Sequence, residues 1–184
     1  MHKSLIFISL TILLAGCAAP RIPFPESELA GLPLKGDKTI KGKVFLIDQL
    51  EEEQIGSGYE VTLEPVSSYS DQWHELVYLK DSPLKKADPR YDNYVLRVEA
   101  DKEGMYIFKD VAPGNYYLTT PFMWSAITCS ANVVKTKVWV SKKISVKASD
   151  SVLEIPLTKE YTSPTVVCDL YNQGDWESEG GYGL

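Results

Sequence analysis

Apolar residues recur at every second position over much of this sequence, and this alternation restricts the fold more than any other feature. It is clearest in residues 39–47 and 59–66, where it places apolar side chains on one face of a strand. Segments rich in Gly and Pro separate the apolar runs, as is usual for connections between strands. We predict an all-β fold, an antiparallel sandwich of about seven to eight strands. The further predicted strands are residues 75–79, 94–100, 105–111, 116–120, 137–140 with 144–146, and 152–157.

Residues 100–118 combine turn and strand residues in a specific order. Gly104 can take the positive φ of a tight turn, and Pro113-Gly114 reverses the chain before the alternation resumes. Between these turns Tyr106 and Phe108 share one face of the predicted strand. The segment resembles the hairpin of carboxypeptidase regulatory-like domains, which are transthyretin-like (prealbumin-like) sandwiches.

The opening strand of that family is matched by Ile40-Lys41-Gly42-Lys43-Val44. The resemblance covers residues 39–48 and 100–120, whereas residues 66–89 and 121–134 depart from it. It implies a module for stability or interaction and no particular chemistry. Fold alone would not define a function in any case.

The N-terminus has the pattern of an export signal. Lys3 gives a basic start, and residues 5–14 form an apolar run of ten residues. A membrane-spanning helix needs about 20 predominantly apolar residues, so this run is too short for an ordinary transmembrane anchor. The following Leu14-Ala15-Gly16-Cys17 resembles the lipobox of bacterial lipoprotein precursors. The resemblance implies that residues 1–16 are removed and that Cys17 carries the lipid.

A secretory signal followed by a chance cysteine is the alternative, and it would leave a soluble periplasmic protein. Two or three acyl chains on Cys17 would need no further anchor, because each buried CH₂ contributes about 0.8 kcal/mol. In lipoproteins, Asp after the cysteine favours retention in the inner membrane. Ala18 therefore implies, by the same resemblance, attachment to the outer membrane on its periplasmic face.

Composition divides the remaining chain into three parts. Four prolines in residues 17–38 favour an extended backbone, so we predict a tether behind the lipidated cysteine. Residues 39–172 are predicted to form one sandwich domain. Residues 173–184 are rich in Gly and acidic side chains, which predicts a disordered tail.

The mature chain is acidic. Residues 1–16 hold one of the 19 basic residues and none of the 25 acidic ones, so 18 − 25 gives a formal charge of −7. Nucleic-acid binding relies on clustered Lys and Arg, so no nucleic-acid partner is expected.

Cysteine usage agrees with export. Cys129 and Cys168 remain as a pair and can form a disulfide, which would contribute on the order of 4 kcal/mol. Two buried free thiols are the alternative. No metal site is expected, because His74 is the only histidine of the mature chain and no paired cysteine spacing exists.

No catalytic constellation emerges from the residue types, so we expect neither an enzyme nor a cofactor. His74 lacks a nucleophile elbow and is more simply a strand or loop residue. Residues 48–54 could form a short helix, but the run Glu51-Glu52-Glu53 favours a solvated loop. Gly56-Ser57-Gly58 lacks the lysine and spacing of a phosphate loop and is expected to form a turn.

Aromatic residues are the remaining candidates for a binding surface. One group is Tyr69, Trp73 and Tyr78, and the other is Phe122 and Trp124 in the expected loop 121–134. We hypothesise that Phe122 and Trp124 bind a partner, since loops on a rigid scaffold often carry function. The alternative places both in the sandwich core.

The sequence favours a membrane-anchored, non-enzymatic interaction or structural module of the bacterial cell envelope, with an envelope protein as partner. The alternative is a carbohydrate-binding or carbohydrate-processing protein that acts on cell-wall glycan.

Overall fold

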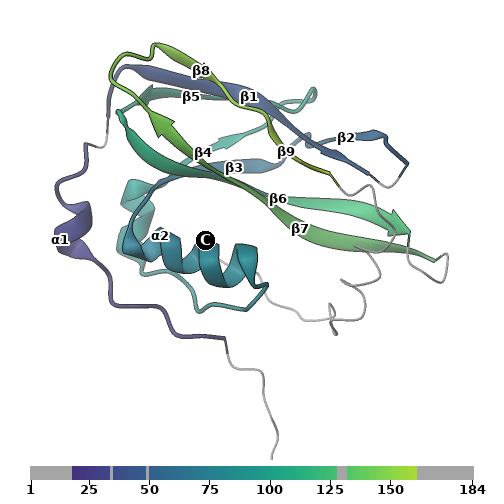
Figure 1. Ribbon diagram of the computed structural model, residues 1–184, viewed down its shortest axis with the longest axis horizontal. Helices are drawn as coiled ribbons and strands as arrows, with labels where there is room; N and C mark the ends of the chain where they lie inside the picture. Colours follow the sequence, from purple (N-terminus) through teal and green to yellow (C-terminus); the bar gives the residue numbers. More distant parts are fainter. Residues whose placement is uncertain (1–17, 34, 49, 128–131, 161–184) are drawn as a thin grey trace, which may run out of the picture.

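Two β-sheets lie face to face in the computed structural model of this chain, which describes residues 18–33, 35–48, 50–127 and 132–160 (Figure 1). The strands are β1 (Lys38–Ile47), β2 (Glu53–Ile55), β3 (Glu60–Pro65), β4 (Leu96–Glu99), β5 (Met105–Val111), β6 (Gly114–Ile127), β7 (Val133–Val146), β8 (Val152–Glu154) and β9 (Leu157–Glu160). In the five-stranded sheet, β1 pairs antiparallel with β2 and β5 and parallel with β8 and β9. The four-stranded sheet has the antiparallel order β4-β3-β6-β7.

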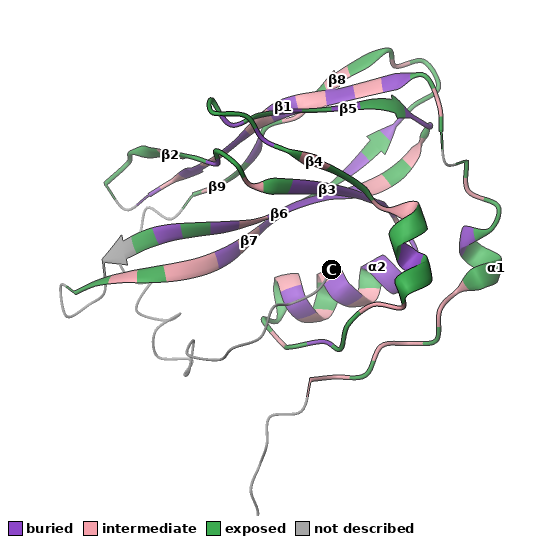
Figure 2. Cartoon of the chain, turned by 180° about the vertical axis from the view of Figure 1, so that it is seen from behind, coloured by how far each residue is buried: buried purple, intermediate pink, exposed green. Residues whose placement is uncertain are grey.

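The predicted all-β sandwich is confirmed. Buried and half-buried residues alternate along β1, as Figure 2 shows, and this follows from the period of two in the sequence. Val44 and Leu46 of β1 are fully buried and belong to the same apolar cluster as Leu63 and Leu118 of the facing sheet. The parallel pairing of β8 and β9 with β1 was not predicted.

The turn between β4 and β5 forms where the sequence predicts it. Asp101 Oδ1 accepts hydrogen bonds from the backbone amides of Glu103 (3.0 Å) and Met105 (2.8 Å). Gly104 has a φ of 79°, the left-handed region that glycine adopts without strain. Tyr106 and Phe108 are both buried, as expected for side chains on the core face of β5.

A long hairpin of β6 and β7 replaces the loop expected at residues 121–134. The two strands stay in register from Gly114 opposite Val146 to Ile127 opposite Val133. The expected strands 116–120, 137–140 and 144–146 are therefore parts of two longer strands. Pro121 does not end β6: it lies opposite Trp139 in the register, and the strand continues to Ile127.

A third layer covers the outer face of the four-stranded sheet (Figure 1). It contains α1 (Glu26–Leu29), α2 (Ser68–Trp73), the π-helical turn η1 (His74–Leu79) and the 3₁₀ helix η2 (Pro89–Tyr94). Trp73 of α2 meets Trp139 of β7 edge to face, with ring centroids 5.0 Å apart. Tyr91 of η2 donates a hydrogen bond to Glu64 of β3 at 2.8 Å. The third layer is thus attached to the sheet through both α2 and η2.

The strand predicted for residues 75–79 is wrong, since this segment belongs to η1. Ser67 starts the helical region with a capping box, in which its side chain and that of Ser70 each accept the other's backbone amide. Tyr69, Trp73 and Val77 are four residues apart and all buried, so they form one apolar stripe of the continuous α2–η1 segment. None of the described residues from 48 to 54 is helical. Residues 50–52 lie in a loop, as the simpler interpretation expects, but Glu53 and Gln54 already belong to β2.

The tether predicted for residues 17–38 also needs correction over its described part. Leu29 is completely buried, against Tyr69 and Tyr91. Arg21 donates from Nη1 to the carbonyl of Tyr69 at 3.1 Å, and Ala19 donates its amide to the carbonyl of Pro83 at 2.8 Å. The prolines keep the backbone extended, but the side chains between them pack onto the domain.

Several expectations concern residues outside the described ranges. They are the lipidation of Cys17, the disulfide between Cys129 and Cys168, and the tail 173–184. Within the described ranges, none of the helices has the length and apolar character that crossing a membrane requires.

Candidate functional site

A cleft of about 290 Å³ opens where the third layer meets one end of the sandwich. Four segments contribute to it: the chain after α1, the end of β3, the junction of η2 and β4, and the turn between β5 and β6. The lining residues are Leu32, Pro33, Pro65, Val66, Asn93, Tyr94, Leu96, Ala112, Pro113, Gly114, Asn115 and Tyr116.

One wall of the cleft is the β5–β6 turn, which its own side chains stabilise. Tyr116 donates from its hydroxyl to the carbonyl of Ala112 at 2.8 Å, so its ring lies across the turn. A Cβ at Gly114 would lie 3.3 Å from that ring, so a larger residue would require the ring to shift by a few tenths of an ångström. Val66 donates its amide to the carbonyl of Asn115 at 2.9 Å and ties the turn to the end of β3.

The opposite wall is the C-terminal end of η2. Asp88 begins this helix by accepting the amide of Arg90 at 3.0 Å, and the hydroxyl of Tyr69 accepts the amide of Asp88 at 2.7 Å. Tyr94 is half-buried, with its ring centroid 6.3 Å from that of Phe24 in the N-terminal segment. The docked N-terminal segment therefore holds this wall in place.

The carboxyl group of Glu64 lies behind this wall, next to the lining residue Pro65 in sequence. Its Oε2 accepts the hydroxyl of Tyr91, whereas Oε1 is buried and has no hydrogen-bond partner among the residues that the structure describes. Burial raises the pKa of Glu64, although the bond from Tyr91 and the charge of Arg21 act in the opposite direction. Glu64 does not line the cleft, so we assign it to the fixing of η2 on the sheet.

The lining of the cleft combines aromatic rings with amide groups. Tyr94 and Tyr116 are half-buried, and Asn93 and Asn115 are exposed. Among the described residues neither asparagine side chain has a hydrogen-bond partner, so each offers both a donor and an acceptor. None of the twelve lining residues, all within the described ranges, carries a charge. Such a surface suits a small neutral ligand that has an apolar face and several hydroxyl groups.

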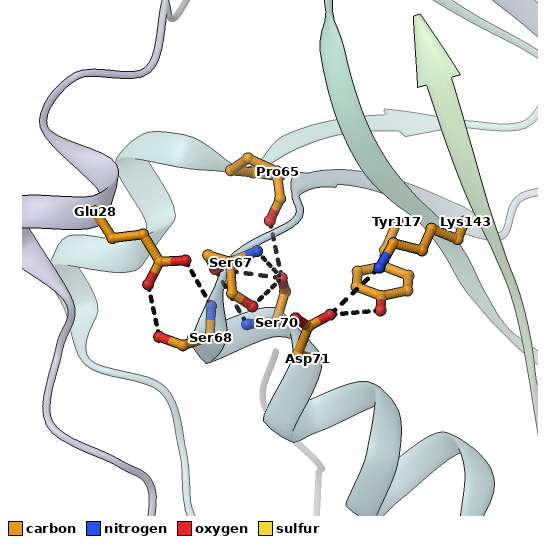
Figure 3. A network of polar contacts seen from close by, with 8 residues as sticks. All are labelled: Glu28, Pro65, Ser67, Ser68, Ser70, Asp71, Tyr117 and Lys143. Carbon is orange, nitrogen blue, oxygen red and sulfur yellow. Dashed lines mark hydrogen bonds and ion pairs between the residues drawn. The ribbon is translucent and has the colours of Figure 1, made fainter.

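A second cluster of polar and aromatic side chains joins α2 to β6 and β7 (Figure 3). Asp71 Oδ1 accepts the hydroxyl of Tyr117 at 2.6 Å and lies 3.7 Å from Nζ of Lys143. His74 stacks on the ring of Tyr117 with a centroid distance of 4.4 Å. Burial lowers the pKa of His74, and the charge of Lys143 lowers it further. These contacts are fully explained by the packing of the helix on the sheet.

The aromatic residues proposed from the sequence fall mostly in the interior. Phe122 and Trp124, expected to bind a partner, are only 2% and 5% exposed and belong to the sandwich core. Their side chains point inward because β6 continues through them, so the core alternative is correct. Tyr69 and Trp73 are likewise buried, and Tyr78 is half-buried beside His74.

Other candidates from the sequence stay apart from the cleft. Glu51 and Glu52 are exposed in the loop before β2, and Glu53 is exposed as the first residue of that strand. No group of three or more His, Cys, Asp or Glu with metal-binding geometry occurs in the described part of the chain.

Asn93, Asn115 and Tyr94 were not predicted from the sequence to form a site. Asn93 and Asn115 are far apart in the sequence, and only the packing of η2 beside the β5–β6 turn brings them to one cleft. A local signal existed only for Tyr116, which follows the Pro-Gly reversal of the hairpin.

Comparison with solved structures shows a likeness that extends over most of this chain. The chain is similar to a crystal structure of a Pseudomonas aeruginosa protein for which carbohydrate binding has been proposed, with 27% identity and a TM-score of 0.67. The similarity covers 76% of this chain and 99% of the other. No protein-family profile and no curated protein matches the sequence.

Two more distant structures have TM-scores too low to support an argument. A 9R-lipoxygenase from Cyanothece is 10% identical, with a TM-score of 0.34 over 72% of this chain and 17% of the enzyme. The major pilin subunit of Bacillus cereus is 10% identical, with a TM-score of 0.37 over 68% of this chain and 30% of the pilin.

Proposed function

We propose that this protein is a non-enzymatic carbohydrate-binding module of the bacterial cell envelope. The observation that carries the proposal is the uncharged cleft, in which Tyr94 and Tyr116 supply aromatic surface and Asn93 and Asn115 supply free amide groups. The likeness to the Pseudomonas aeruginosa protein, which extends over nearly all of that chain, supports the same assignment.

The ligand class follows from the chemistry of the lining. A pyranose ring presents C–H groups on its face and hydroxyls at its edge, so a tyrosine ring and an amide can contact it together. An uncharged lining gives no compensation for the desolvation of a carboxylate or phosphate, which favours a neutral sugar. The volume of about 290 Å³ lies just below the range for drug-sized ligand pockets, about 300–1,000 Å³. The cleft therefore suits a single sugar unit or the end of a chain.

The place of action rests on the sequence. We propose that Cys17 is acylated and that the protein is held on the periplasmic face of the outer membrane, where it meets cell-wall glycan. Two acyl chains suffice for stable attachment. We also assign the sandwich to the carboxypeptidase regulatory-like type, which the turn at Asp101 and Gly104 supports.

Sugar binding to the soluble mature chain, residues 17–184 with Cys17→Ser, tests the proposal directly. A panel of neutral and acidic saccharides is screened, and the affinity for each sugar that binds is measured by calorimetry. We expect a neutral sugar to bind, and Asn93→Ala or Asn115→Ala to weaken binding about ten-fold, as expected for the loss of one hydrogen bond.

Asn132→Ala is the matched control. Asn132 lies beyond the far end of β6 from Gly114, about 40 Å away at about 3.3 Å per residue. The Asn132→Ala variant should bind the sugar with the same affinity as the parent chain. Failure of every neutral sugar to bind, or full affinity in both cleft variants, would contradict the proposal.

Protein recognition remains a second candidate, favoured by the far end of the β6–β7 hairpin. Met123 and Val133 are 45% and 69% exposed there, unlike most large apolar residues of these strands. A protein partner would cover them, and Val133→Glu would then abolish its recovery with the lipidated protein. Unchanged recovery with this variant would exclude the hairpin end.

A further inference from the structure

We propose that residues 79–86 form a membrane-facing surface that contacts anionic lipid headgroups. This inference rests on the proposed acylation of Cys17. It adds an orientation: the loop after η1 faces the bilayer, and the five-stranded sheet faces away from it.

The backbone just after Cys17 is fixed to this loop. Ala19 forms a parallel bridge with Leu84, donating its amide to the carbonyl of Pro83 at 2.8 Å and accepting the amide of Lys85 at 2.9 Å. Leu84 is only 9% exposed and packs in the cluster of Trp73 and Val77.

Two further contacts strengthen this attachment. Arg21 donates from Nε to the carbonyl of Lys85 at 3.1 Å. Gln72 of α2 donates from Nε2 to the carbonyl of Pro20 at 3.0 Å, and its Oε1 accepts the amide of Ile22 at 3.0 Å. The chain next to the anchor is therefore part of the folded domain.

The covalent chain leaves little distance between the lipid and the loop. Cys17 and Ala19 are two residues apart, which spans at most about 7 Å between their Cα atoms. The headgroup region is about 5–7 Å thick on each side of the hydrocarbon. With acyl chains on Cys17 in the bilayer, residues 79–86 must lie at or next to the headgroups.

The side chains of the loop suit that position. Leu79 is 64% exposed, and the loop holds three lysines and only one acidic residue, Asp81. Lys80 pairs with Glu75 at 2.7 Å, whereas Lys85 and Lys86 are exposed and form no ion pair within the described residues. Juxtamembrane lysines of this kind are attracted to anionic lipid, although the protein as a whole is acidic.

The test measures how fast individual lysines react with an acetylating reagent. The full lipidated protein is placed in vesicles of phosphatidylcholine with phosphatidylglycerol, and the soluble mature chain, residues 17–184 with Cys17→Ser, is the reference. We expect Lys85 and Lys86 to react at least three-fold more slowly in the vesicles. Lys109 on β5, in the five-stranded sheet, should react at the same rate in both samples.

Two further measurements distinguish a failure of the acylation from a failure of the orientation or of the role of anionic lipid. Mass spectrometry of the N-terminus reports the acyl chains, and their absence would overturn the anchor together with this inference. With the acyl chains present, unchanged rates at Lys85 and Lys86 would overturn the orientation alone. If anionic headgroups contribute, Lys85 and Lys86 should react more slowly with phosphatidylglycerol present than in pure phosphatidylcholine, and added salt should reduce the difference. Equal reaction rates in the two kinds of vesicle would overturn the role of anionic headgroups.

Discussion

The two faces of the four-stranded sheet are covered in different ways. Its inner face packs on the other sheet through aliphatic and aromatic side chains such as Leu63, Leu118 and Phe122. Its outer face carries Glu64 and Tyr117, which bind the third layer through hydrogen bonds to Tyr91 and Asp71. The inner face therefore contributes most of the buried apolar surface. The third layer on the outer face forms one wall of the cleft and fixes the chain next to the proposed anchor.

The largest expected effect is on the inner face. Phe122→Ala should lower the free energy of unfolding by about 3–5 kcal/mol, because it empties a fully packed site in the core. Chemical denaturation measures this, and Met123→Ala, at the neighbouring exposed position, is the control and should change it little. A small effect of Phe122→Ala would mean that this side chain lies outside the core.

The next effect tests whether the N-terminal segment is docked. Leu29→Ala should cost about 2–4 kcal/mol, because Leu29 is completely buried against Tyr69 and Tyr91. Leu79→Ala removes an equally large but exposed side chain and serves as the control in the same denaturation experiment. If both variants were as stable as the parent chain, residues 18–33 would be a free tether after all.

The smallest expected effect is the contribution of Glu64, on the outer face, to the pH dependence of the unfolding free energy. Burial raises the pKa of Glu64 above the ordinary value of 4.5, so the folded chain holds a proton that the unfolded chain has released. The corresponding stability is present below that value and is lost as the pH rises through the raised pKa. Glu64→Gln should remove this fall from a plot of unfolding free energy against pH.

Tyr91→Phe sharpens the same comparison. It removes the hydrogen bond that favours the ionised carboxylate, so the fall with pH should become larger than in the parent chain. Parallel curves for the parent chain and Glu64→Gln would show that this carboxyl does not titrate differently in the folded state.

The same division between the two faces separates what the sequence could predict from what it could not. The strands of the sandwich follow from local alternation, and the turn at Gly104 follows from its need for a positive φ. The helical layer was missed because His74–Leu79 is short and rich in residues that also favour strands. The four-residue spacing of Tyr69, Trp73 and Val77 was the available signal.

The site was harder to predict because it is made by tertiary contacts. Phe122 and Trp124 were plausible anchors as long as β6 was expected to end at Thr120, and extension of the strand turned both inward. Asn93 and Asn115 belong to different layers, and no local pattern relates them. The burial of Leu29 likewise depends on tertiary contacts, because folding must first bring Tyr69 and Tyr91 together to form the surface on which it packs.

The central claim is that the cleft between the two layers binds a neutral sugar, and backbone amide shifts measured by nuclear magnetic resonance test it most directly. The soluble mature chain, residues 17–184 with Cys17→Ser, is titrated with the neutral sugar that gives the largest shifts. The account predicts that the changes concentrate at residues 93–96 and 114–116, on both walls of the cleft. Shifts confined to the far end of the β6–β7 hairpin, or none with any neutral sugar, would contradict it.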